Sequence, residues 1–401
     1  MSGVVIIGGG HAAGQAAASL RQEGYEGAIT LIGEEPHPPY QRPPLSKAYL
    51  AGEQGIEKVY LRPENFYESK DITLQKGVRV GAIDTKAQSV TTDSGATTPW
   101  EQLIIATGTR PRQLPVPGAD LAGVHYLRTI ADVDGIRAEL TSDTQLVIIG
   151  GGYIGLEVAA VAIEAGAQVS VLEMEGRILQ RVTTEQMSAF YHQLHTKRGI
   201  DIRVNTGATA IEGNDKVTAV VCGDEKIPAD LVIVGIGVIP NIELAEAAGI
   251  ICDNGIVVDE RCLTSAPNVY AIGDCSNHPN PLLDRRLRLE SVPNAMEQSR
   301  VTAANIVGKD RTYASMPWFW SDQYDLKLQM LGFSADGDEV VQRGDMANNE
   351  FAVFYLKDGA IVAVDAVNSP REFMAAKQLV GKTIDKAKLA DTSVPIKDLL
   401  G

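Results

Sequence analysis

The sequence predicts an α/β protein with two Rossmann-like dinucleotide-binding domains and a small α+β domain at its C-terminal end. A glycine turn between an apolar strand and an alanine-rich helix occurs twice, near residue 8 and near residue 150. Further apolar runs end in small residues, which is typical of parallel strands that approach a ligand at their carboxyl ends. After Met316 the pattern changes to short β-rich runs without a glycine turn.

The central glycine turn has the sequence Gly150-Gly-Gly152-Tyr-Ile-Gly155 and follows a buried strand. Gly150 and Gly152 allow a tight turn and close approach of a pyrophosphate, and Gly155 allows helix and strand to pack closely. The helix N-terminus adds free N–H groups and a positive dipole end. The next apolar run, 169–172, ends at Glu173, 18 residues after Gly155, where a carboxylate can accept from a ribose 2′-hydroxyl. The alternative is a glycine turn that only packs a βαβ unit.

The first glycine turn, Gly8-Gly-Gly10-His-Ala-Ala13, repeats this pattern as G-x-G-x-x-A. An alanine-rich helix and the strand 28–32 follow, and Glu34 lies 21 residues after Ala13. The two turns are about 140 residues apart, too far for a solenoid repeat. Two such units imply two dinucleotides, and an enzyme that holds two most simply passes electrons between them.

The composition excludes several classes of partner. The chain has 36 basic and 51 acidic residues and a net charge of −15, which disfavours nucleic acid and anionic membranes. Its four cysteines form no CxxC pair, which fits a reducing cytoplasm. The first strand begins at residue 4, and no apolar run approaches the 18 residues of a membrane span. We therefore expect a cytoplasmic protein with neither nucleic acid nor membrane as a partner.

A proline-rich segment follows the first unit. Five prolines between residues 36 and 44 predict a shaped loop, since proline interrupts helices and central strands. The loop is expected to bring Arg42 and Lys47 close to the first nucleotide unit, where they suit a phosphate or an electron-rich ring edge. The alternative is two solvated charges.

Other elements follow from apolar runs and turn residues. The predicted strands and helices before residue 316 are strands at 78–83, 89–92, 102–108, 217–222, 230–235 and 268–273, and a helix at 184–198. Small residues at strand ends let backbone lie against a ligand, as at Ala106-Thr107-Gly108 and Gly235-Ile-Gly237. Asp274, at the end of strand 268–273, is placed to accept from a sugar or ribitol hydroxyl, or alternatively to cap the next segment.

The C-terminal part is predicted to be α+β. Strands are expected at 328–333 and 340–343, with a hairpin of 351–356 and 360–366 that turns at Lys357-Asp-Gly359. Helices are expected at 371–379 and over the last ten residues.

Together these motifs resemble the FAD-dependent ferredoxin reductases of the putidaredoxin reductase type, which have a glutathione-reductase-like fold. The motifs are the two glycine turns, Arg42-Pro-Pro-Leu-Ser-Lys47, Ala106-Thr-Gly108, Gly235-Ile-Gly237, Gly273-Asp274 and Pro317-Trp-Phe-Trp-Ser-Asp-Gln323. The resemblance implies that segments 1–112 and 243–315 bind FAD, that 113–242 binds NADH, and that 316–401 forms the C-terminal domain.

The resemblance also implies roles for single residues. The expected FAD contacts are Gly8, Gly10, Ala12, Ala13, Glu34, Arg42, Lys47, Val80, Ala106, Thr107, Gly108, Arg128, Asp274 and Val292. The expected NADH contacts are Gly150, Gly152, Ile154, Gly155, Glu173, Arg181, Gly235 and Gly237. Glu157, in the first turn of its helix, is expected near the nicotinamide, or alternatively as a charge satisfied by the helix dipole. Trp320 is expected beside the isoalloxazine facing the acceptor, or alternatively as a core tryptophan.

The absence of cysteines after the first glycine-turn unit argues against the flavoproteins that pass electrons through a thiol. Residues 35–60 contain no cysteine, so a thiolate relay has no thiol there. Nothing in the sequence resembles a Ser-His-Asp set or a metal cluster. By the resemblance, NADH passes a hydride to FAD, and single electrons go to a [2Fe–2S] ferredoxin that supplies a monooxygenase or dioxygenase. Alternatives are reduction of a small radical or quinone, as in monodehydroascorbate reductases, and a redox sensor of the apoptosis-inducing-factor kind.

Partner and cofactor selectivity are expected from charged residues. An acidic ferredoxin is expected to dock on a cluster of basic residues. The alternative for each arginine alone is a solvated surface charge. The cluster comprises Arg62, Arg285, Arg286, Arg288 and Arg300. Glu173 would repel a 2′-phosphate and favour NADH over NADPH, while Arg177 and Arg181 could soften that preference. We expect a monomer or a weak dimer.

Overall fold

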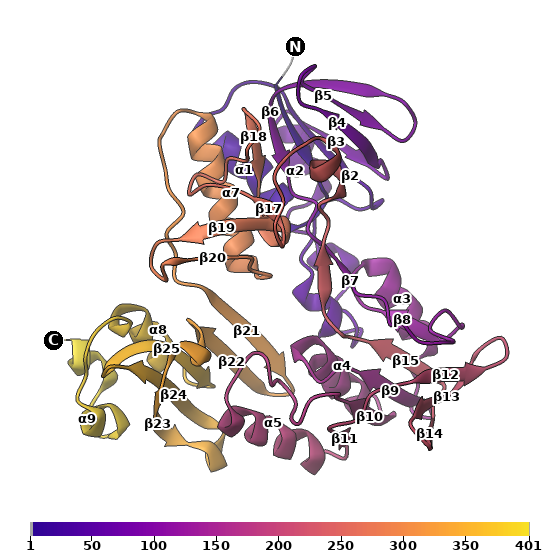
Figure 1. Ribbon diagram of the computed structural model, residues 1–401, viewed down its shortest axis with the longest axis vertical. Coiled ribbons are helices and arrows are strands. Elements are labelled where there is room, and N and C mark those ends of the chain that lie inside the picture. The colour runs from indigo at the N-terminus through magenta and orange to yellow at the C-terminus, as the bar shows by residue number, and fades with distance from the viewer. Residues whose placement is uncertain (1–2, 401) are drawn as a thin grey trace. The chain divides into compact units, whose positions relative to one another are not determined.

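The computed structural model describes residues 3–400 (Figure 1). The chain divides into two compact units. The first unit consists of Met1–Pro43, Gln54–Arg110 and Val238–Ser315. The second consists of Pro44–Glu53, Pro111–Gly237 and Met316–Gly401. The four domain boundaries expected from the sequence stay a prediction. Within residues 3–400 no helix is both long and apolar enough to cross a membrane.

The first unit is built on a parallel sheet. Its strands run in the order β3-β2-β1-β6 with β18 beside β6, and their bounds are β1 (Gly3–Ile7), β2 (Ile29–Gly33), β3 (Ile72–Lys76), β6 (Thr97–Ile105) and β18 (Val269–Ala271). The first part of β6 continues into an antiparallel meander with β5 (Ser89–Thr92) and β4 (Val80–Asp84). The strands expected from the apolar runs in this part are confirmed.

Alternation along β1 explains how this sheet is covered. Val4 and Ile6 pack in one cluster with α1 (His11–Glu23) and α7 (Val292–Ile306), whereas Val5 and Ile7 pack in another with the meander and α6 (Glu243–Ala247). Helices α1 and α7 lie side by side (Figure 1), and the small side chains of α1 allow this closeness. The first glycine-turn helix, α1, therefore belongs to a covered parallel sheet, as a Rossmann-like unit requires.

The second unit contains a parallel sheet with a comparable arrangement. The order is β11-β10-β9-β15-β8, with bounds β8 (Val124–Tyr126), β9 (Gln145–Ile149), β10 (Gln168–Leu172), β11 (Asp201–Arg203) and β15 (Leu231–Val234). A second meander again accompanies the sheet and packs on it; it is formed by β12 (Ala210–Gly213), β13 (Val217–Cys222) and β14 (Glu225–Pro228). The helices of this part are α3 (Ile130–Glu139), α4 (Tyr153–Glu164) and α5 (Glu185–Lys197).

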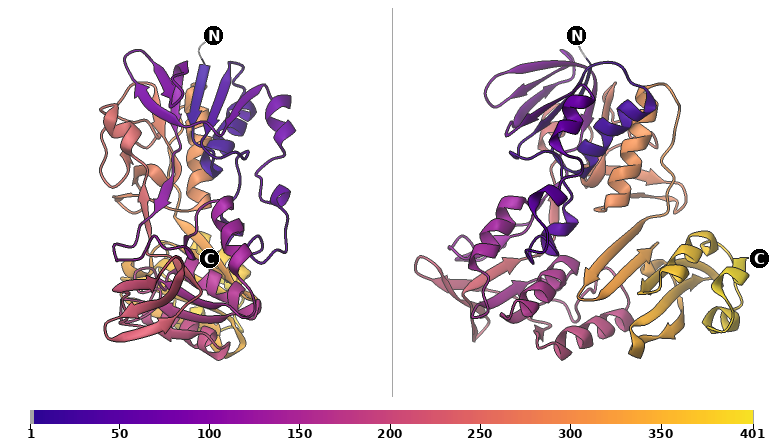
Figure 2. Two further views of the ribbon diagram at one scale, coloured as in Figure 1. Left: turned by 90° about the vertical axis from the view of Figure 1, so that its right-hand side faces the viewer. Right: turned by 180° about the vertical axis from the view of Figure 1, so that it is seen from behind.

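The C-terminal sheet is antiparallel, in the order β21-β22-β25-β24-β23. Its bounds are β21 (Trp318–Gln323), β22 (Leu326–Leu331), β23 (Glu339–Asp345), β24 (Glu350–Lys357) and β25 (Ala360–Val367). Helices α8 (Pro370–Leu379) and α9 (Lys386–Ala390) cover one face (Figure 2). The other face contacts α5, where the Phe190 and Phe351 rings lie 4.9 Å apart. The two Rossmann-like sheets and this α+β part confirm the predicted fold class.

One expectation in this part needs correction, and one strand was missed. The prediction of a helix over the last ten residues is wrong. After α8, the described residues form α9, which ends at Ala390, and a 3-10 turn at Ile396–Leu400. Gly401 lies outside the described residues. Strand β21 was not expected, because its aromatic run Trp-Phe-Trp breaks period-two alternation. The remaining short elements are α2 (Glu64–Ser69), β7 (Thr109–Pro111), β16 (Val238–Pro240), β17 (Ile256–Val257), β19 (Ser276–Asn280) and β20 (Arg285–Leu287).

Candidate dinucleotide and redox sites

The first glycine of each turn is required by the backbone. Gly8 has φ of 129°, and a Cβ there would lie 2.2 Å from the Ala106 carbonyl oxygen. Gly150 has φ of 116°, and its Cβ would lie 2.4 Å from the Gly235 carbonyl oxygen. Both residues thus hold the turn against the end of the neighbouring strand, β6 or β15, which only glycine permits.

The third glycine of each run faces open space. Gly10 and Gly152 have φ of −93° and −82°, and a Cβ at either would meet nothing within 4 Å. No side chain among the described residues caps α1 or α4, which begin at the next residue. Their first N–H groups therefore stay available beside an open space, which fits a dinucleotide pyrophosphate.

The next positions of the motifs differ in exposure. Ala12 and Ala13 are buried in the α1 packing. A Cβ at Gly155 would lie 2.3 Å from the Gly150 carbonyl oxygen, so this glycine is needed for packing. Ile154 is 46% exposed, so its side chain can contact a ligand at this turn. Gly237 has φ of 100° and open space at its Cβ position, so backbone can approach a ligand there.

The two acidic residues of the fingerprints are held differently. Glu173 accepts hydrogen bonds from the backbone N–H groups of Gly151 and Glu175, both at 2.9 Å. Glu34 is exposed, and within the described part of the chain Arg79, at 3.9 Å, is the only ion-pair partner of its carboxylate. The carboxylate is therefore fixed in the second unit and unrestrained in the first.

The basic residues after Glu173 also differ. Arg177 donates to the backbone carbonyls of Thr184 and Gln180, and to the Ser188 hydroxyl. Arg181 is exposed. Arg177 is thus occupied by the loop before α5, and Arg181 is the basic side chain with freedom to reach a ligand.

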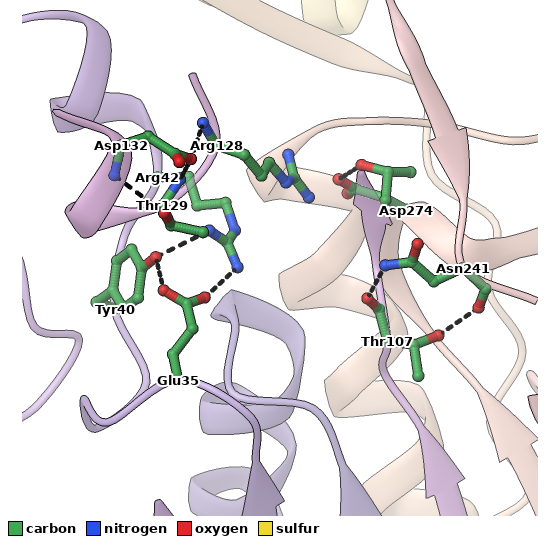
Figure 3. A network of polar contacts seen from close by, with 10 residues as sticks. Glu35, Tyr40, Arg42, Thr107, Arg128, Thr129, Asp132, Asn241 and Asp274 are labelled. Atoms are coloured by element: carbon green, nitrogen blue, oxygen red, sulfur yellow. Dashed lines mark hydrogen bonds and ion pairs between the residues drawn. The ribbon is translucent and has the colours of Figure 1, made fainter. Parts of the chain in front are cut away.

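Arg42 belongs to a polar network in the first unit (Figure 3). Its guanidinium donates to the Tyr40 hydroxyl at 2.9 Å and forms an ion pair with Glu35 at 3.0 Å. Tyr40 donates in turn to Glu35 at 2.5 Å. Burial alone would lower the pKa of Arg42, but Tyr40 and Glu35 raise it, so the guanidinium remains charged. The alternative of a freely solvated Arg42 is wrong.

A second polar group lies at the end of β6 (Figure 3). Thr107 donates to the Asn241 backbone carbonyl at 2.7 Å, and the Asn241 amide donates to the Thr107 carbonyl at 2.9 Å. Thr109 donates to the Asp274 carboxylate at 3.3 Å. Ile272, not Asp274, occupies the N-cap position of the 3-10 helix Gly273–Cys275, so the capping alternative for Asp274 is wrong.

His11, the first residue of α1, was not among the cofactor contacts expected from the sequence. Its Nδ1 atom is buried, with no hydrogen-bond partner in the described part of the chain. Burial and the nearby Arg62 lower its pKa to about 4, while Asp274 acts in the opposite direction. A buried nitrogen without a hydrogen-bond partner among the described residues, next to the open Gly10 turn, is typical of a site in which a polar ligand supplies that partner. The residues of the first unit therefore fit FAD.

The remaining expected contacts occupy defined positions in their units. Val80 is buried on β4, and Val292 is the first residue of α7, which Ser291 caps. The backbone N–H of Arg128 donates to Asp132, which forms a capping box with Thr129 at the start of α3 (Figure 3).

Glu157 is a buried carboxylate of the second unit with several side-chain partners. It is 3% exposed and forms an ion pair with Lys47 at 2.6 Å. Ser46 donates to the same oxygen at 2.5 Å, and Ser321 donates to the other oxygen at 2.7 Å. Burial raises the pKa of Glu157, while Lys47 and the two hydroxyls oppose that rise.

This geometry corrects two expectations. Glu157 is the fifth residue of α4 and lies in its second turn, not its first, and named side chains rather than the helix dipole satisfy it. Arg42 and Lys47 were expected together, but Lys47 belongs to the second unit, where it contacts Glu157. A flavin contact for Lys47 stays a prediction.

Trp320 is half-buried in the middle of β21. Its ring lies 5.7 Å from that of Trp318 and 6.3 Å from that of Phe319. It is therefore not a fully buried core residue, and part of its ring remains available to a ligand or partner.

The five arginines expected to bind a partner lie in the first unit with unequal freedom. Arg286 donates to the backbone carbonyls of Val258 and Asn277. Arg288 forms an ion pair with Glu290 at 2.6 Å and its side chain is 13% exposed. Arg300 pairs with Glu297. Arg62 donates to Gln15 at 3.2 Å and lies over the Phe66 ring, and Arg285 is exposed on β20.

Over residues 3–400, no group of three or more His, Cys, Asp or Glu could hold a metal ion, and the four cysteines are free thiols. Cys262 and Cys275 are buried, and burial raises the pKa of both. A reactive thiolate is disfavoured at these two positions.

Comparison with known proteins places this arrangement in a family. Residues 2–299 match the model of the pyridine nucleotide-disulphide oxidoreductases, and residues 318–400 match that of the reductase C-terminal domain. The chain belongs to the pyridine nucleotide-disulphide oxidoreductase family. It is an oxidoreductase that uses FAD and NAD(H), as members of this family do.

The relatives are more specific. The chain is 46% identical to putidaredoxin reductase of Pseudomonas putida, over 99% of this chain and 96% of that protein. It is 44% identical to the ferredoxin–NAD(+) reductase component of the anthranilate 1,2-dioxygenase system of Burkholderia cepacia, over 99% and 98%. The structure also matches the reductase in a covalent putidaredoxin reductase–putidaredoxin complex, with a TM-score of 0.96, 46% identity and coverage of 100% and 98%. Within the family, the chain is a member of the ferredoxin reductases.

Proposed function

We propose that the protein is an NADH-dependent ferredoxin reductase that supplies single electrons to a [2Fe–2S] ferredoxin, which in turn serves a monooxygenase or dioxygenase. One observation carries this proposal: two parallel sheets of like strand order each end in an uncapped glycine turn with open space, at Gly10 and at Gly152. Two dinucleotides held by one chain point to electron transfer between them. The ferredoxin reductases among its relatives identify the acceptor class.

The first unit holds FAD in this proposal. The N–H groups of α1 and the open side of Gly10 receive the pyrophosphate, and the carboxylate of Asp274 accepts from a ribityl hydroxyl. The buried Nδ1 of His11 and the charged Arg42 lie in the same unit and supply polar partners. FAD, when bound, supplies the conversion between two-electron hydride chemistry and single-electron transfer.

The second unit holds NADH. The open turn at Gly152 receives the pyrophosphate, and Glu173, which two N–H groups fix, accepts from the adenosine ribose. A 2′-phosphate would meet this fixed negative charge, so NADH is preferred over NADPH. Glu157 lies near the nicotinamide, where its ion pair with Lys47 fixes the position of a charge next to the reacting ring.

Two features are proposed to serve the acceptor, each within its own unit: Trp320 in the second unit and the basic cluster in the first. Trp320 is half-buried, so its ring can lie beside the isoalloxazine and still face a partner. Among the arginines, Arg62, Arg285 and Arg300 are favoured over Arg286 and Arg288 on exposure. Arg285 is exposed and the Arg300 side chain is 42% exposed, whereas the Arg288 side chain is 13% exposed and Arg286 donates to two backbone carbonyls. The protein is further proposed to be cytoplasmic and a monomer or weak dimer.

An anaerobic titration tests the proposal. NADH added to the yellow protein should bleach the flavin, and a [2Fe–2S] ferredoxin added afterwards should restore the yellow colour as it is reduced. Failure of NADH to bleach the flavin would overturn the reductase proposal. Bleaching followed by electron transfer to a quinone, but not to ferredoxin, would favour the small-acceptor alternative. Slow bleaching with a persistent charge-transfer band would favour the redox sensor.

A further inference from the structure

A row of hydrogen bonds runs from Glu157 through the second unit. Ser321, on β21, donates to Glu157 Oε1 at 2.7 Å. The Gln323 amide nitrogen, two residues along the same strand, donates to the Ser321 hydroxyl at 3.1 Å. Ser321 and Gln323 point to the same side of β21 because strand side chains alternate.

The row continues onto α5. His195 Nε2 lies 2.7 Å from the Gln323 amide oxygen, and His195 Nδ1 lies 2.9 Å from the Tyr324 hydroxyl. His195, Gln323 and Ser321 are at most 1% exposed. The row ends at Tyr324, which is partly exposed and has the Arg198 guanidinium 3.9 Å from its ring centre.

The chemistry of these groups gives every bond the same direction. An amide oxygen can only accept, so His195 Nε2 carries the proton, and a neutral imidazole then accepts at Nδ1 from the Tyr324 O–H. The Gln323 amide donates to Ser321, and the Ser321 hydroxyl is left to donate to the carboxylate. Each donor therefore points toward Glu157, and aligned hydrogen bonds polarise one another.

We propose that this donor chain positions the carboxylate of Glu157 and stabilises its ionised form, so that four side chains with no predicted ligand contact act on the redox site. The donor chain consists of Ser321, Gln323, His195 and Tyr324. Lys47 and Ser46 act on the other carboxylate oxygen, and Ser321 is the donor to Oε1. The significance of Glu157 for NADH oxidation rests on the proposed function, but the action of the chain on its carboxylate does not.

The charges around the chain are consistent with it. Burial lowers the pKa of His195 to about 4, although the Gln323 hydrogen bond opposes this. Arg198, the C-cap residue of α5, and His192, on α5, lower it further. Burial also raises the pKa of Tyr324. The histidine thus stays neutral and the phenol stays protonated over the working range, which preserves the direction of the chain. Lys47 is the cation in contact with Glu157. Burial raises the pKa of Tyr153 and of Tyr191, so both phenols of the surrounding helices stay protonated and neutral.

The direct test measures the protonation of Glu157 in the oxidised FAD-loaded protein without NADH. Carboxyl ¹³C resonances of glutamate-labelled protein are followed with pH, and the resonance that disappears in Glu157→Gln is assigned to Glu157. We expect Ser321→Ala to raise the Glu157 pKa by about one unit, since a hydrogen bond to a charged group is of that strength. Gln323→Leu should raise it less, and Tyr324→Phe by a few tenths of a unit. Ser321→Thr should restore the wild-type value because it returns the hydroxyl.

Tyr191→Phe is the matched control. Tyr191 lies one helical turn before His195 on α5, and its buried hydroxyl has no hydrogen-bond partner among the described residues. Its removal should leave the Glu157 pKa unchanged. The variants of Ser321, Gln323 and Tyr324 should also shift the pH dependence of flavin reduction by NADH, in the order of their effects on the Glu157 pKa. Tyr324→Phe should do so without a change in thermal stability. Equal pKa values in wild type and Ser321→Ala, or an equal shift in Tyr191→Phe, would overturn the proposal. Failure of ferredoxin reduction alone would leave this result standing and would count against the proposed function only.

Discussion

At the scale of single residues, the fixed charge of Glu173 determines which nicotinamide cofactor the proposed site accepts. Two backbone N–H groups hold its carboxylate at 2.9 Å, so it cannot turn away from a 2′-phosphate without losing both bonds. We expect Glu173→Gln to raise the ratio of kcat/KM for NADPH to that for NADH about tenfold, equivalent to roughly 1.4 kcal/mol. Steady-state kinetics with both cofactors measure the ratio.

Glu175→Gln is the control for that substitution. It removes the same charge two residues away, where the carboxylate accepts from the Gln180 side chain at 3.0 Å. A ratio that is unchanged in Glu173→Gln, or that changes equally in both variants, would contradict the assignment of Glu173 to the adenosine ribose.

The residue scale is also where the sequence was least informative. Lys47 and Glu157 were each expected in a nucleotide site, but their ion pair joins positions 110 residues apart, and no local pattern encodes such a contact. The same holds for Ser321 and His195, whose roles follow from a strand and a helix that meet only in the tertiary fold. His11 offered a local signal, since a histidine within a glycine turn is unusual enough to be examined as a ligand.

At the scale of elements, the first and third glycines of each turn have different roles. The first is required by the backbone, and the third is proposed to leave room for the cofactor. Gly152→Ala introduces a Cβ into open space at an ordinary φ of −82°, so the fold should be unaffected. The added methyl group would occupy the space proposed for the pyrophosphate, and we expect the Kd for NADH to rise at least tenfold. Thermal unfolding and NADH titration give the two readouts.

Gly150→Ala should behave in the opposite way. Its φ of 116° and the carbonyl oxygen 2.4 Å from the new Cβ impose strain, which we expect to cost about 1–3 kcal/mol of folding free energy. A Gly152→Ala variant that binds NADH normally would show that the open space at this turn does not receive the cofactor.

The contact between α5 and the C-terminal sheet contains a buried acid that links stability to pH. Asp365, on β25, accepts from Thr183 at 2.6 Å and from Tyr355 at 2.8 Å. Burial raises its pKa to about 6, against the donated hydrogen bonds. The folded protein therefore keeps a proton that the unfolded chain loses near its ordinary pKa, and the free energy of unfolding should fall as pH rises from about 4 to about 6 and remain lower above it.

We expect Asp365→Asn to remove this fall, which corresponds to roughly 3 kcal/mol for a difference of about two pKa units. Denaturant unfolding over a pH series that starts below the ordinary aspartate pKa and ends at about pH 8 measures it. Asp358→Asn, in the exposed β24–β25 turn, provides the control, because its carboxylate has no comparable burial. Parallel pH profiles of stability for wild type and Asp365→Asn would contradict the account.

Elements with a strong local signal were predicted well. The turns at Gly8 and Gly150 combine a buried strand, glycines and an alanine-rich helix, and β13 and the hairpin at Lys357–Gly359 follow from alternation and turn residues. Strand β21 was missed because Trp318, Phe319 and Trp320 in succession give no alternation, and the terminal helix was wrong because apolar residues without caps form only a 3-10 turn at Ile396–Leu400.

At the scale of the whole molecule, a net charge of −15 opposes the docking of an acidic ferredoxin, so any productive contact depends on a local basic surface. We expect the combined variant Arg285→Gln and Arg300→Gln to raise the KM for ferredoxin severalfold and to weaken the rise of KM with ionic strength. Ferricyanide reduction by NADH should not change, because a small acceptor needs no docking surface.

Arg261→Gln is the comparison for that variant. Arg261 is an exposed arginine of the same unit, paired with Asp310, and is outside the basic cluster. If it changed the ferredoxin KM as much as the double variant, the effect would reflect general surface charge, and the proposed docking surface would be wrong.

The central claim, that one chain carries electrons from NADH to a ferredoxin, is tested most directly by anaerobic double-mixing stopped flow. NADH is mixed with the FAD-loaded protein, and the product is mixed with an oxidised [2Fe–2S] ferredoxin while flavin and iron–sulfur absorbance are recorded. The account predicts fast bleaching of the flavin by NADH, followed by ferredoxin reduction at the rate at which the flavin is reoxidised. A bleached flavin that stays reduced in the presence of ferredoxin would contradict it.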